Sequence, residues 1–411
     1  MVPVEEVREI ILASVEKLGW EYAELLDALG RVLAEEIIAP EPIPPWDNAA
    51  MDGYALRSED SRGASTEQPV ELRMIGTVGA GQIYDGLVEK GQAVRIMTGA
   101  PMPRGADTVI RQEDTQATDQ GVFLLRQVRS GQNVRYKGED VKAGEQVLVS
   151  GTLCRPGVVG LLAALGRKRV AVHQRPRVGI LATGDELLRW DEAPTPGKIH
   201  NSNSHALAAQ VLQAGAVPVL VGPVADTPDL IAERIREGLR GDLLLTSGGV
   251  SVGDFDLMGE TLEQLGADVR VRKVNMRPGK PFTFALLKGK AIFALPGNPI
   301  SCMVTFELFV RPALRKMQGR RRLFHSEVTA TAGQSISNRD RRPAYLRVIL
   351  TQTDAGYTAR LTGDQGSAML HSMAHADGLA VVPGETEIPA GSEVRILLLD
   401  DDTTTNTAKV S

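Results

Sequence analysis

The chain has 411 residues, a length that suggests two to four domains of ordinary size. Its 46 basic and 51 acidic residues give a net charge of −5, which argues against a general nucleic-acid binder because such proteins rely on surplus basic charge. Cys154 and Cys302 share no short spacing, so they exclude a thiolate zinc site, an iron–sulfur cluster and a disulfide framework, and they indicate a reducing cytoplasm. No apolar run approaches the roughly 20 residues of a membrane helix, and the N-terminus lacks the basic start of a signal peptide.

The N-terminal segment is predicted to be helical. Apolar residues recur at helical spacing over 4–18, and Gly19 is expected to end this helix. A second amphipathic stretch at 21–29 predicts another helix that stops at Gly30. Four prolines between positions 40 and 45 then force an extended connection.

Residues 46–140 are predicted to form a β-rich module. Short apolar runs alternate there with glycine turns, a pattern typical of small β-structures. The runs cover 70–75, 93–97, 108–112 and 122–128, and a further one follows at 146–149. A short helix is expected at 156–165, where it can return to the N-terminal helices, so 1–45 and 141–175 are assigned to one helical, linking domain.

Residues 176–321 alternate between strand-like and helix-like patterns, which predicts a doubly wound α/β domain with an at least partly parallel sheet. The expected strands are 178–183, 217–221, 243–246, 269–274, 282–285 and 291–295. The expected helices are 204–213, 228–239 with Thr227 as N-cap, 255–265 and 299–317. Residues 322–400 return to β-like runs (345–351, 357–361, 379–382 and 393–399) and are assigned to a C-terminal β-barrel, and 401–411 to a disordered tail. The predicted fold class is therefore α/β plus β.

The loops that follow the strands of the α/β domain are the first candidates for chemistry, because ligands bind beyond the carboxyl ends of strands in such sheets. The loop at 183–187 carries Asp185 and Glu186, either of which alone is better explained as a helix cap. The glycine-rich loop at 246–256 offers N–H groups and hydroxyls for a phosphate, and an ordinary strand-to-helix turn capped by Asp254 explains it about as well. The loop at 295–301 has Asn298 as expected N-cap and Ser301 beside unpaired helix donors, so an anion site and a well-capped helix predict the same residues.

Fixed cations and acids lie near these loops in the sequence. Arg277 and Lys280 stand three residues apart in a turn stiffened by two prolines, which favours a functional role. Acids beside a phosphate site make sense when a divalent cation bridges them, and oxygen ligands favour Mg²⁺. The acids considered for this role are Glu186, Asp226, Asp254 and Asp256.

The remaining motifs carry weaker signals. Around Asp52, Thr98 and 135–140 the β-module has short polar turns, each of which alone is better explained by turn chemistry than by catalysis. His371 and His375 are four residues apart without further ligands, so a zinc site is disfavoured.

Together these motifs resemble molybdopterin molybdenumtransferases of the MoeA type, similar to the C-terminal domain of gephyrin. The motifs run in family order over nearly the whole chain. They are 47–55 (Asp-Asn-Ala-Ala-Met-Asp-Gly-Tyr-Ala), 97–101, 138–140, 183–187, 247–251, 278–281 and 295–301. Arg277 stands where the family pattern has a lysine, and Ala49 where a serine is commoner.

The resemblance implies an elongated four-domain subunit and a homodimer whose active site is shared between subunits. It implies that adenylated molybdopterin receives molybdate with Mg²⁺ and releases AMP, and that a molybdopterin adenylyltransferase and molybdoenzymes are partners. The residues implied as catalytic are Asp52, Thr98, Arg135, Asp140 and Glu186, and those implied as metal ligands are Glu186, Asp226 and Asp256. The residues implied to bind the pterin nucleotide or molybdate are Ser247, Gly248, Gly249, Ser251, Arg277, Lys280, Pro296, Gly297, Asn298, Ser301, Ser367 and an arginine, Arg342 or Arg347.

Two other functions remain open at this point. A nucleotide pyrophosphatase or deamidase of the CinA type uses a similar α/β domain but does not need the loops at 48–55 and 138–140. A non-enzymatic cofactor carrier or scaffold is the other alternative, and the chain lacks the long linker expected of a neuronal-type scaffold.

Overall fold

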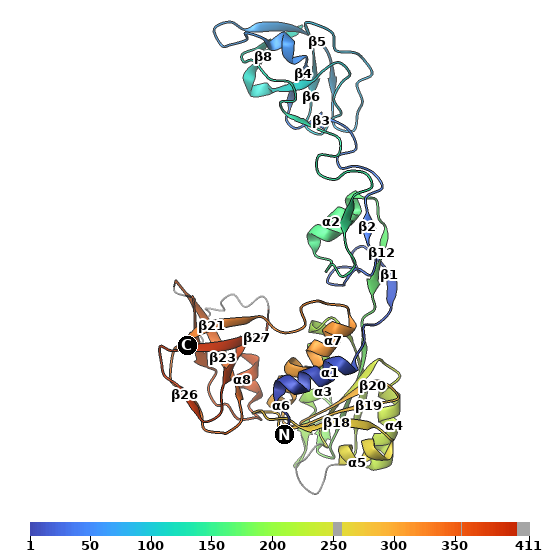
Figure 1. The fold of residues 1–411 in the computed structure, drawn as a ribbon, viewed down its shortest axis with the longest axis vertical. Helices are drawn as coiled ribbons and strands as arrows, with labels where there is room; N and C mark the ends of the chain where they lie inside the picture. Colours follow the sequence, from blue (N-terminus) through green and yellow to red (C-terminus); the bar gives the residue numbers. More distant parts are fainter. Residues whose placement is uncertain (250–256, 355, 401–411) are drawn as a thin grey trace. The chain divides into compact units, whose positions relative to one another are not determined.

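The computed structural model describes residues 1–249, 257–354 and 356–400, which fall into two compact units (Figure 1). Unit 1 comprises Met1–Ala23, Ala28–Ala34 and Ala171–Ser411, and unit 2 comprises Glu24–Asp27 and Glu35–Val170. The β-rich module expected at 46–140 lies within unit 2, and the segments 176–321 and 322–400 lie within unit 1. The finer division into four domains stays a prediction, and the tail at 401–411 lies outside the described residues.

Unit 1 contains a six-stranded sheet with the order β16-β13-β17-β20-β19-β18. The first four strands are parallel, and β19 and β18 run antiparallel to their neighbours. The strands are β13 (Arg177–Thr183), β16 (Val217–Val224), β17 (Leu243–Ser247), β18 (Asp268–Lys273), β19 (Pro281–Leu287) and β20 (Lys290–Leu295). This confirms the prediction of an α/β domain with a partly parallel sheet.

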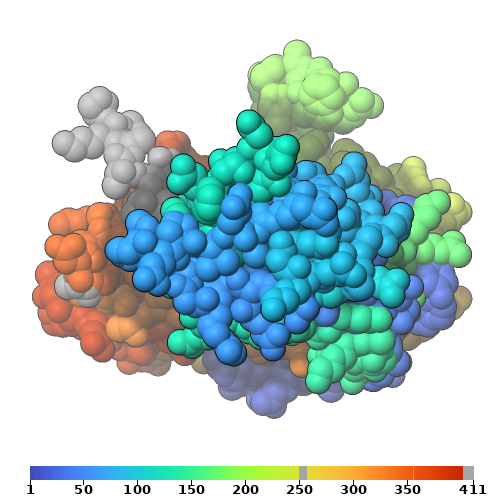
Figure 2. All heavy atoms as spheres, turned by 90° about the horizontal axis from the view of Figure 1, so that it is seen from above, coloured from blue at the N-terminus to red at the C-terminus, as the bar shows by residue number. Residues whose placement is uncertain are grey.

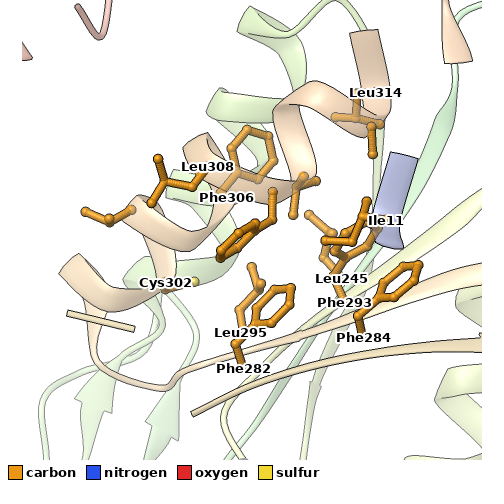
Figure 3. Close-up of a cluster of buried hydrophobic side chains, with 14 of the residues drawn as sticks. Ile11, Leu245, Phe282, Phe284, Phe293, Leu295, Cys302, Phe306, Leu308 and Leu314 are labelled. Atoms are coloured by element: carbon orange, nitrogen blue, oxygen red, sulfur yellow. The ribbon is translucent and has the colours of Figure 1, made fainter. Parts of the chain in front are cut away.

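Helices cover both faces of this sheet, which is why its central strands are buried along almost their whole length and are mostly apolar. One face packs against α1 (Val4–Ser14), α3 (Ser202–Gln213), α6 (Pro299–Thr305) and α7 (Arg311–Met317), and the other against α4 (Pro228–Gly238) and α5 (Leu257–Gln264). Figure 3 shows the first of these cores, which includes Phe282 and Phe293. The Phe282 and Phe309 ring centroids are 4.7 Å apart.

The long helix predicted at 299–317 contains a π-helical turn, Phe306–Val310, between α6 and α7. Pro312 lacks the N–H that would bond to the carbonyl of Leu308, so the regular ladder is interrupted at this point. The Leu308 carbonyl instead accepts a hydrogen bond from Arg8 Nε at 3.2 Å. This hydrogen bond links α1 to the π-helical turn between α6 and α7.

The prediction for the N-terminal segment is partly wrong. The first helix ends at Ser14 rather than near Gly19, and 21–29 is not helical. Trp20–Glu24 forms β1, which pairs with β12 (Arg169–His173) from a distant part of the chain, and turns follow it. Pairing with a distant strand overrides the local helical pattern here. The helix expected at 156–165 is confirmed as α2 (Pro156–Ala164).

The C-terminal barrel is confirmed. Five strands close in the order β21-β24-β23-β25-β27, and β22 pairs separately with β26. These elements are β21 (Glu327–Ala332), β22 (Ile336–Asn338), β23 (Ala344–Thr353), β24 (Gly356–Leu361), α8 (Leu370–Ala374), β25 (Gly378–Val382), β26 (Thr386–Ile388) and β27 (Glu393–Leu398). Two further short strands, β14 (Leu187–Leu188) and β15 (Ile199–His200), pair in the α/β part of unit 1.

Unit 2 is β-rich, as predicted, and most of its atoms are coloured blue to green in Figure 2. Its main sheet has the order β7-β4-β6-β5-β9-β8, and two small sheets pair β10 with β3 and β11 with β2. The strands are β2 (Ile37–Ile38), β3 (Asn48–Ala49), β4 (Gly53–Leu56), β5 (Val70–Val78), β6 (Gln92–Ile96), β7 (Thr108–Arg111), β8 (Thr115–Ala117), β9 (Gly121–Leu124), β10 (Val134–Arg135) and β11 (Gln146–Leu148). Within the described ranges, no helix is both long and apolar enough to cross a bilayer.

Candidate functional site

A cleft of about 550 Å³ opens in unit 1 where β13, β17 and β20 end. Its position agrees with the general location of ligand sites at the carboxyl ends of parallel strands. It is lined by Ala182, Thr183, Glu186, Leu187, Ile199, His200, Asn201, Ser202, Asn203, Ser247, Gly248, Gly297, Asn298, Pro299 and Ala368. The structure thus brings the three predicted strand-end loops to one cavity.

Glycine is required where two of these loops meet. Gly248 has φ +96°, and a Cβ built on it would lie 2.3 Å from the carbonyl oxygen of Thr183. Gly249, with φ +66°, would place a Cβ 3.0 Å from Thr183 Oγ1. No L side chain adopts these angles at such contacts without strain, so the glycines let the end of β17 pack directly against the end of β13. Pro296 is buried, and Ser251 and Asp254 lie outside the described residues.

Two asparagines at the start of α3 are part of this site, and the sequence analysis missed both. Asn201 caps α3, because its Oδ1 accepts a hydrogen bond from Ser204 N at 3.1 Å. The Asn203 side chain contacts two of the strand-end loops. Its Nδ2 donates one hydrogen bond to Ser247 Oγ and another to the Gly297 carbonyl, each at 2.7 Å. The Asn-Ser-Asn-Ser run at 201–204 was the available signal, but it also marks an ordinary helix start.

The N-cap predictions for α6 and α4 are confirmed for the position of each residue, but the expected capping hydrogen bonds are not formed. Asn298 and Thr227 occupy the N-cap positions of α6 and α4, but neither side chain makes a capping hydrogen bond. At Asn298 this leaves the side chain exposed at the cleft, where it lines the cavity.

Three carboxylates gather beside the cleft. Burial raises the pKa of Asp226, and the negative charges of Asp185 and Glu186 raise it further. The Asp226 backbone N–H donates to Asp185 Oδ1 at 3.2 Å, which ties the end of β16 to the loop after β13. Mutual repulsion of this kind is relieved when a cation binds. Asp256 lies outside the described residues, and within the described ranges no group of three or more His, Cys, Asp or Glu side chains is arranged to hold a metal.

Replacing Asp226 by asparagine is expected to raise the melting temperature at pH 7 by about 1–2 °C, a modest gain for a half-buried group. Because folding raises the pKa of Asp226, the folded chain holds this proton more tightly than the unfolded chain. This tighter proton binding stabilises the folded chain. The contribution is fully present below the pKa that Asp226 has in the unfolded chain, and it is lost as the pH rises through the pKa that Asp226 has in the folded chain. Melting curves of both proteins at pH 3 and pH 7 test this: the difference should vanish at pH 3, and an equal difference at both would contradict it.

The segments that carry the predicted oxyanion residues of unit 1 contact α6 at different points. A Cβ on Gly279 would lie 2.5 Å from Thr305 Cγ2, so the turn that carries Arg277 and Lys280 packs directly on α6. The Ile300 N–H, in the first turn of that helix, donates to the Ser367 carbonyl at 3.1 Å. The turn therefore packs against the end of α6, and the loop with Ser367 against its start, where Ser301 is buried.

The two candidate arginines have different surroundings. Arg342 forms an ion pair with Asp340, with Nη2 2.6 Å from Oδ2, and Arg342 holds the pKa of Asp340 well below its usual range. Arg347 is fully buried, and its guanidinium donates to Ser372 Oγ at 2.9 Å and to the carbonyls of Asp364 and Gly366 at 2.9 and 3.2 Å. Arg347 thus holds the loop that precedes Ser367.

The remaining predicted residues lie in unit 2 and are exposed: Asp52, Thr98, Arg135 and Asp140. Asp52 Oδ1 accepts hydrogen bonds from the backbone N–H and the hydroxyl of Thr98, both at 2.7 Å. These bonds lower the pKa of Asp52, so its carboxylate is charged at neutral pH. Arg135 lies on β10, paired with Asn48 of β3, and the Asp140 N–H donates to the Ile43 carbonyl at 3.1 Å. The motifs at 47–55 and 97–101 are joined by the Asp52–Thr98 contact.

Comparisons with known proteins agree with the motif assignment. Residues 2–166 match the family described as MoeA N-terminal region (domain I and II), 179–316 match a probable molybdopterin binding domain, and 329–399 match the MoeA C-terminal region (domain IV). A protein of Nostoc sp. named molybdopterin molybdenumtransferase is 39% identical, over 97% of this chain and 94% of its own length. One of the same name from Bacillus subtilis is 36% identical, over 98% and 95%. The crystal structure of the molybdopterin biosynthesis protein moeA of Pyrococcus horikoshii superposes with a TM-score of 0.82 at 33% identity, covering 97% of this chain and 100% of the other.

Proposed function

We propose a reaction for this chain from the premise that it belongs to the MoeA family of molybdopterin molybdenumtransferases. In this proposal the chain is a transferase that joins molybdate to the dithiolene of adenylated molybdopterin: the two sulfurs displace one molybdate oxygen, which leaves as water with the two thiol protons. Water cleaves the phosphoanhydride bond, so that AMP leaves as the molybdenum cofactor forms. The observation that carries the proposal is the cleft at the ends of β13, β17 and β20, into which three family motifs converge.

The ligand of this cleft is a nucleotide-tagged pterin in our proposal. Backbone N–H groups around Gly248 and Gly249 and the hydroxyl of Ser247 suit phosphoryl oxygens, because they offer donors at a strand end without a bulky side chain. The net charge of the protein is −5, so a polyanionic ligand must be held by such local donors rather than by the overall field.

Molybdate is proposed to bind beside the start of α6. Arg277 and Lys280 supply positive charge on a turn that packs against this helix, and Ser301 and Ser367 supply hydroxyls. The two proposed sites adjoin, because Pro299 and Ala368 line the cleft while their neighbours Ile300 and Ser367 share a hydrogen bond. Binding molybdate next to the pterin nucleotide places the reacting groups side by side, and this positioning supplies much of the rate acceleration in our proposal.

Glu186 and Asp226 are proposed to hold Mg²⁺, with Asp256. The residues suit a cation, because burial and the negative charges of Asp185 and Glu186 raise the pKa of Asp226, and oxygen ligands are those that Mg²⁺ prefers. A bound Mg²⁺ would neutralise phosphoryl charge as AMP departs.

The exposed residues Asp52, Thr98, Arg135 and Asp140 are proposed to act on the partner subunit of a homodimer. Their role rests on the family resemblance, and the hydrogen-bonded, charged state of Asp52 supports it. We further propose that the chain works in the cytoplasm, where its two free cysteines stay reduced, and receives its substrate from a molybdopterin adenylyltransferase before serving molybdoenzymes.

The alternatives are less well supported. A pyrophosphatase or deamidase of the CinA type needs only the α/β domain, whereas the family matches at 2–166 and 329–399 lie outside it. A cofactor carrier or scaffold would not need the exposed Asp52 carboxylate that Thr98 holds by two hydrogen bonds.

The proposed reaction is tested by AMP release. The purified chain is incubated with adenylated molybdopterin, MgCl₂ and molybdate, and AMP is measured by chromatography. We expect AMP to form together with molybdenum-bound pterin, and more slowly when molybdate is omitted. AMP release no faster than in a protein-free control would overturn the proposal.

A further inference from the structure

Two exposed histidines at α8 lie against each other. His371 belongs to this short helix and His375 is its C-cap, so the two side chains are four residues apart and project from the same side of the turn. Their Nε2 atoms are 3.2 Å apart, whereas the centroids of the two rings are 4.6 Å apart. The rings therefore approach each other with their Nε2 edges.

Among residues 1–249, 257–354 and 356–400, neither imidazole has a hydrogen-bond or ion-pair partner other than its neighbour. In a neutral imidazole one nitrogen carries the proton and the other carries a lone pair. A direct hydrogen bond between the two Nε2 atoms requires a different tautomer in each ring. When both rings carry the proton on Nδ1, two lone pairs face the same point, and a cation at that point binds both.

The separation of the two nitrogens suits a transition-metal ion. Zn–N bonds are about 2.05 Å long, and two such bonds span 3.2 Å at an N–Zn–N angle of about 103°, which is close to tetrahedral. In helices with the pattern H-E-x-x-H, two histidines at the same spacing bind one Zn²⁺ from one face of the helix. Imidazole nitrogens suit Zn²⁺, Ni²⁺ and Cu²⁺, whereas Mg²⁺ prefers oxygen ligands.

We propose that His371 and His375 form a binding site for a divalent transition-metal ion of the Zn²⁺ type, separate from the proposed Mg²⁺ site. Within the described ranges no third His, Cys, Asp or Glu joins the pair, so water fills the remaining coordination positions of the exposed ion. The lack of further ligands is why the sequence spacing alone disfavours zinc. The close approach of the two Nε2 atoms is visible only in the folded chain.

A metal at this place would stabilise the element that anchors the loop before Ser367. The buried Ser372 lies between the two histidines in the sequence, and its Oγ accepts a hydrogen bond from Arg347 Nε at 2.9 Å. The same guanidinium donates to the carbonyls of Asp364 and Gly366. A helix of one turn has few hydrogen bonds of its own, so a metal that joins both of its ends adds stability to the folded chain.

Zinc binding to the full chain tests the proposal. Zn²⁺ is titrated by calorimetry into the wild type and into His371→Gln and His375→Gln, with MgCl₂ in excess to compete for carboxylate oxygens. We expect each substitution to weaken Zn²⁺ binding at least about tenfold, because a single remaining imidazole cannot chelate the ion. Zn²⁺ should also raise the melting temperature of the wild type but not that of either variant.

A control variant and a second measurement make the test independent of folding defects. Ala374→Gln, at an exposed position of the same helix, is the matched control and should bind Zn²⁺ as the wild type does. Urea unfolding without metal shows whether each variant remains folded. In the wild type itself, NMR should show Zn²⁺ shifting the ring signals of His371 and His375 together.

Each outcome decides the matter. No zinc binding by the wild type, equal binding by the wild type and either variant, or a shift of only one of the two ring signals would overturn the inference. The inference does not depend on the proposed reaction. Zinc binding through both histidines in a chain that releases no AMP from adenylated molybdopterin would uphold the metal site and overturn the proposed reaction.

Discussion

Replacing Asp52 by asparagine is expected to lower the rate of AMP release by about a thousandfold or more, a loss on the scale seen when an essential charged group is removed. The carboxylate is exposed, and two hydrogen bonds from Thr98 lower its pKa and fix its direction. Asparagine keeps the shape and one acceptor but loses the charge. The rate is measured with saturating adenylated molybdopterin and molybdate.

The stability of the chain should change little in this variant, because the side chain is exposed. Glu71→Gln, at an exposed position on β5 of the same unit, is the matched control and should keep the wild-type rate. A rate for Asp52→Asn within tenfold of the wild type would contradict the proposed role of Asp52.

Mixing subunits tests the shared site. Asp52→Asn and Lys280→Ala subunits are each expected to be inactive alone, because each lacks one half of the proposed site. If the halves belong to different subunits, mixed dimers contain one intact site, and activity should return to about a quarter of the wild-type value after equimolar exchange. No recovery in dimers shown to have exchanged would contradict a shared site.

Replacing Arg347 by methionine is expected to lower the free energy of unfolding by about 3 kcal/mol. Arg347 is fully buried, and burial lowers the pKa of its guanidinium; its Nε and Nη2 donate three hydrogen bonds to Ser372, Asp364 and Gly366, while Nη1 has no partner among the described residues. Methionine fills a similar volume but leaves those acceptors without their donor. Urea unfolding of the full chain measures the loss.

The same change should also raise the KM for molybdate. Arg347 holds the loop at 364–366, which leads directly to Ser367 and its hydrogen bond with Ile300. Arg341→Met is the matched control, since that side chain is 91% exposed and its ion pair with Glu385 is a surface contact. A loss of stability no larger than the control's would contradict the structural role of Arg347.

The strand-end loops were predictable because strand periodicity and turn residues are local signals. Parallel strands place their carboxyl ends at one edge, so Thr183, Ser247 and Gly297 could be expected near each other before any coordinates were known. The barrel strands and the β-rich module followed from the same alternation of apolar runs and turns.

The features that escaped prediction depend on partners far away in the chain. The 21–29 segment has helical spacing, but β1 gains its stability from β12, nearly 150 residues later. Asn203 looks like a helix-start residue until Ser247 and Gly297 are placed beside it. Arg342 and Arg347 differ by five positions, and only tertiary structure reveals that one pairs with Asp340 and the other is enclosed.

The most direct test of the account is a crystal structure of the chain with adenylated molybdopterin and Mg²⁺. We predict that the nucleotide-tagged pterin lies in the cleft at the ends of β13, β17 and β20, with a phosphoryl oxygen within hydrogen-bond distance of Ser247 Oγ. Ligand density at another place, with this cleft filled only by water, would contradict the account.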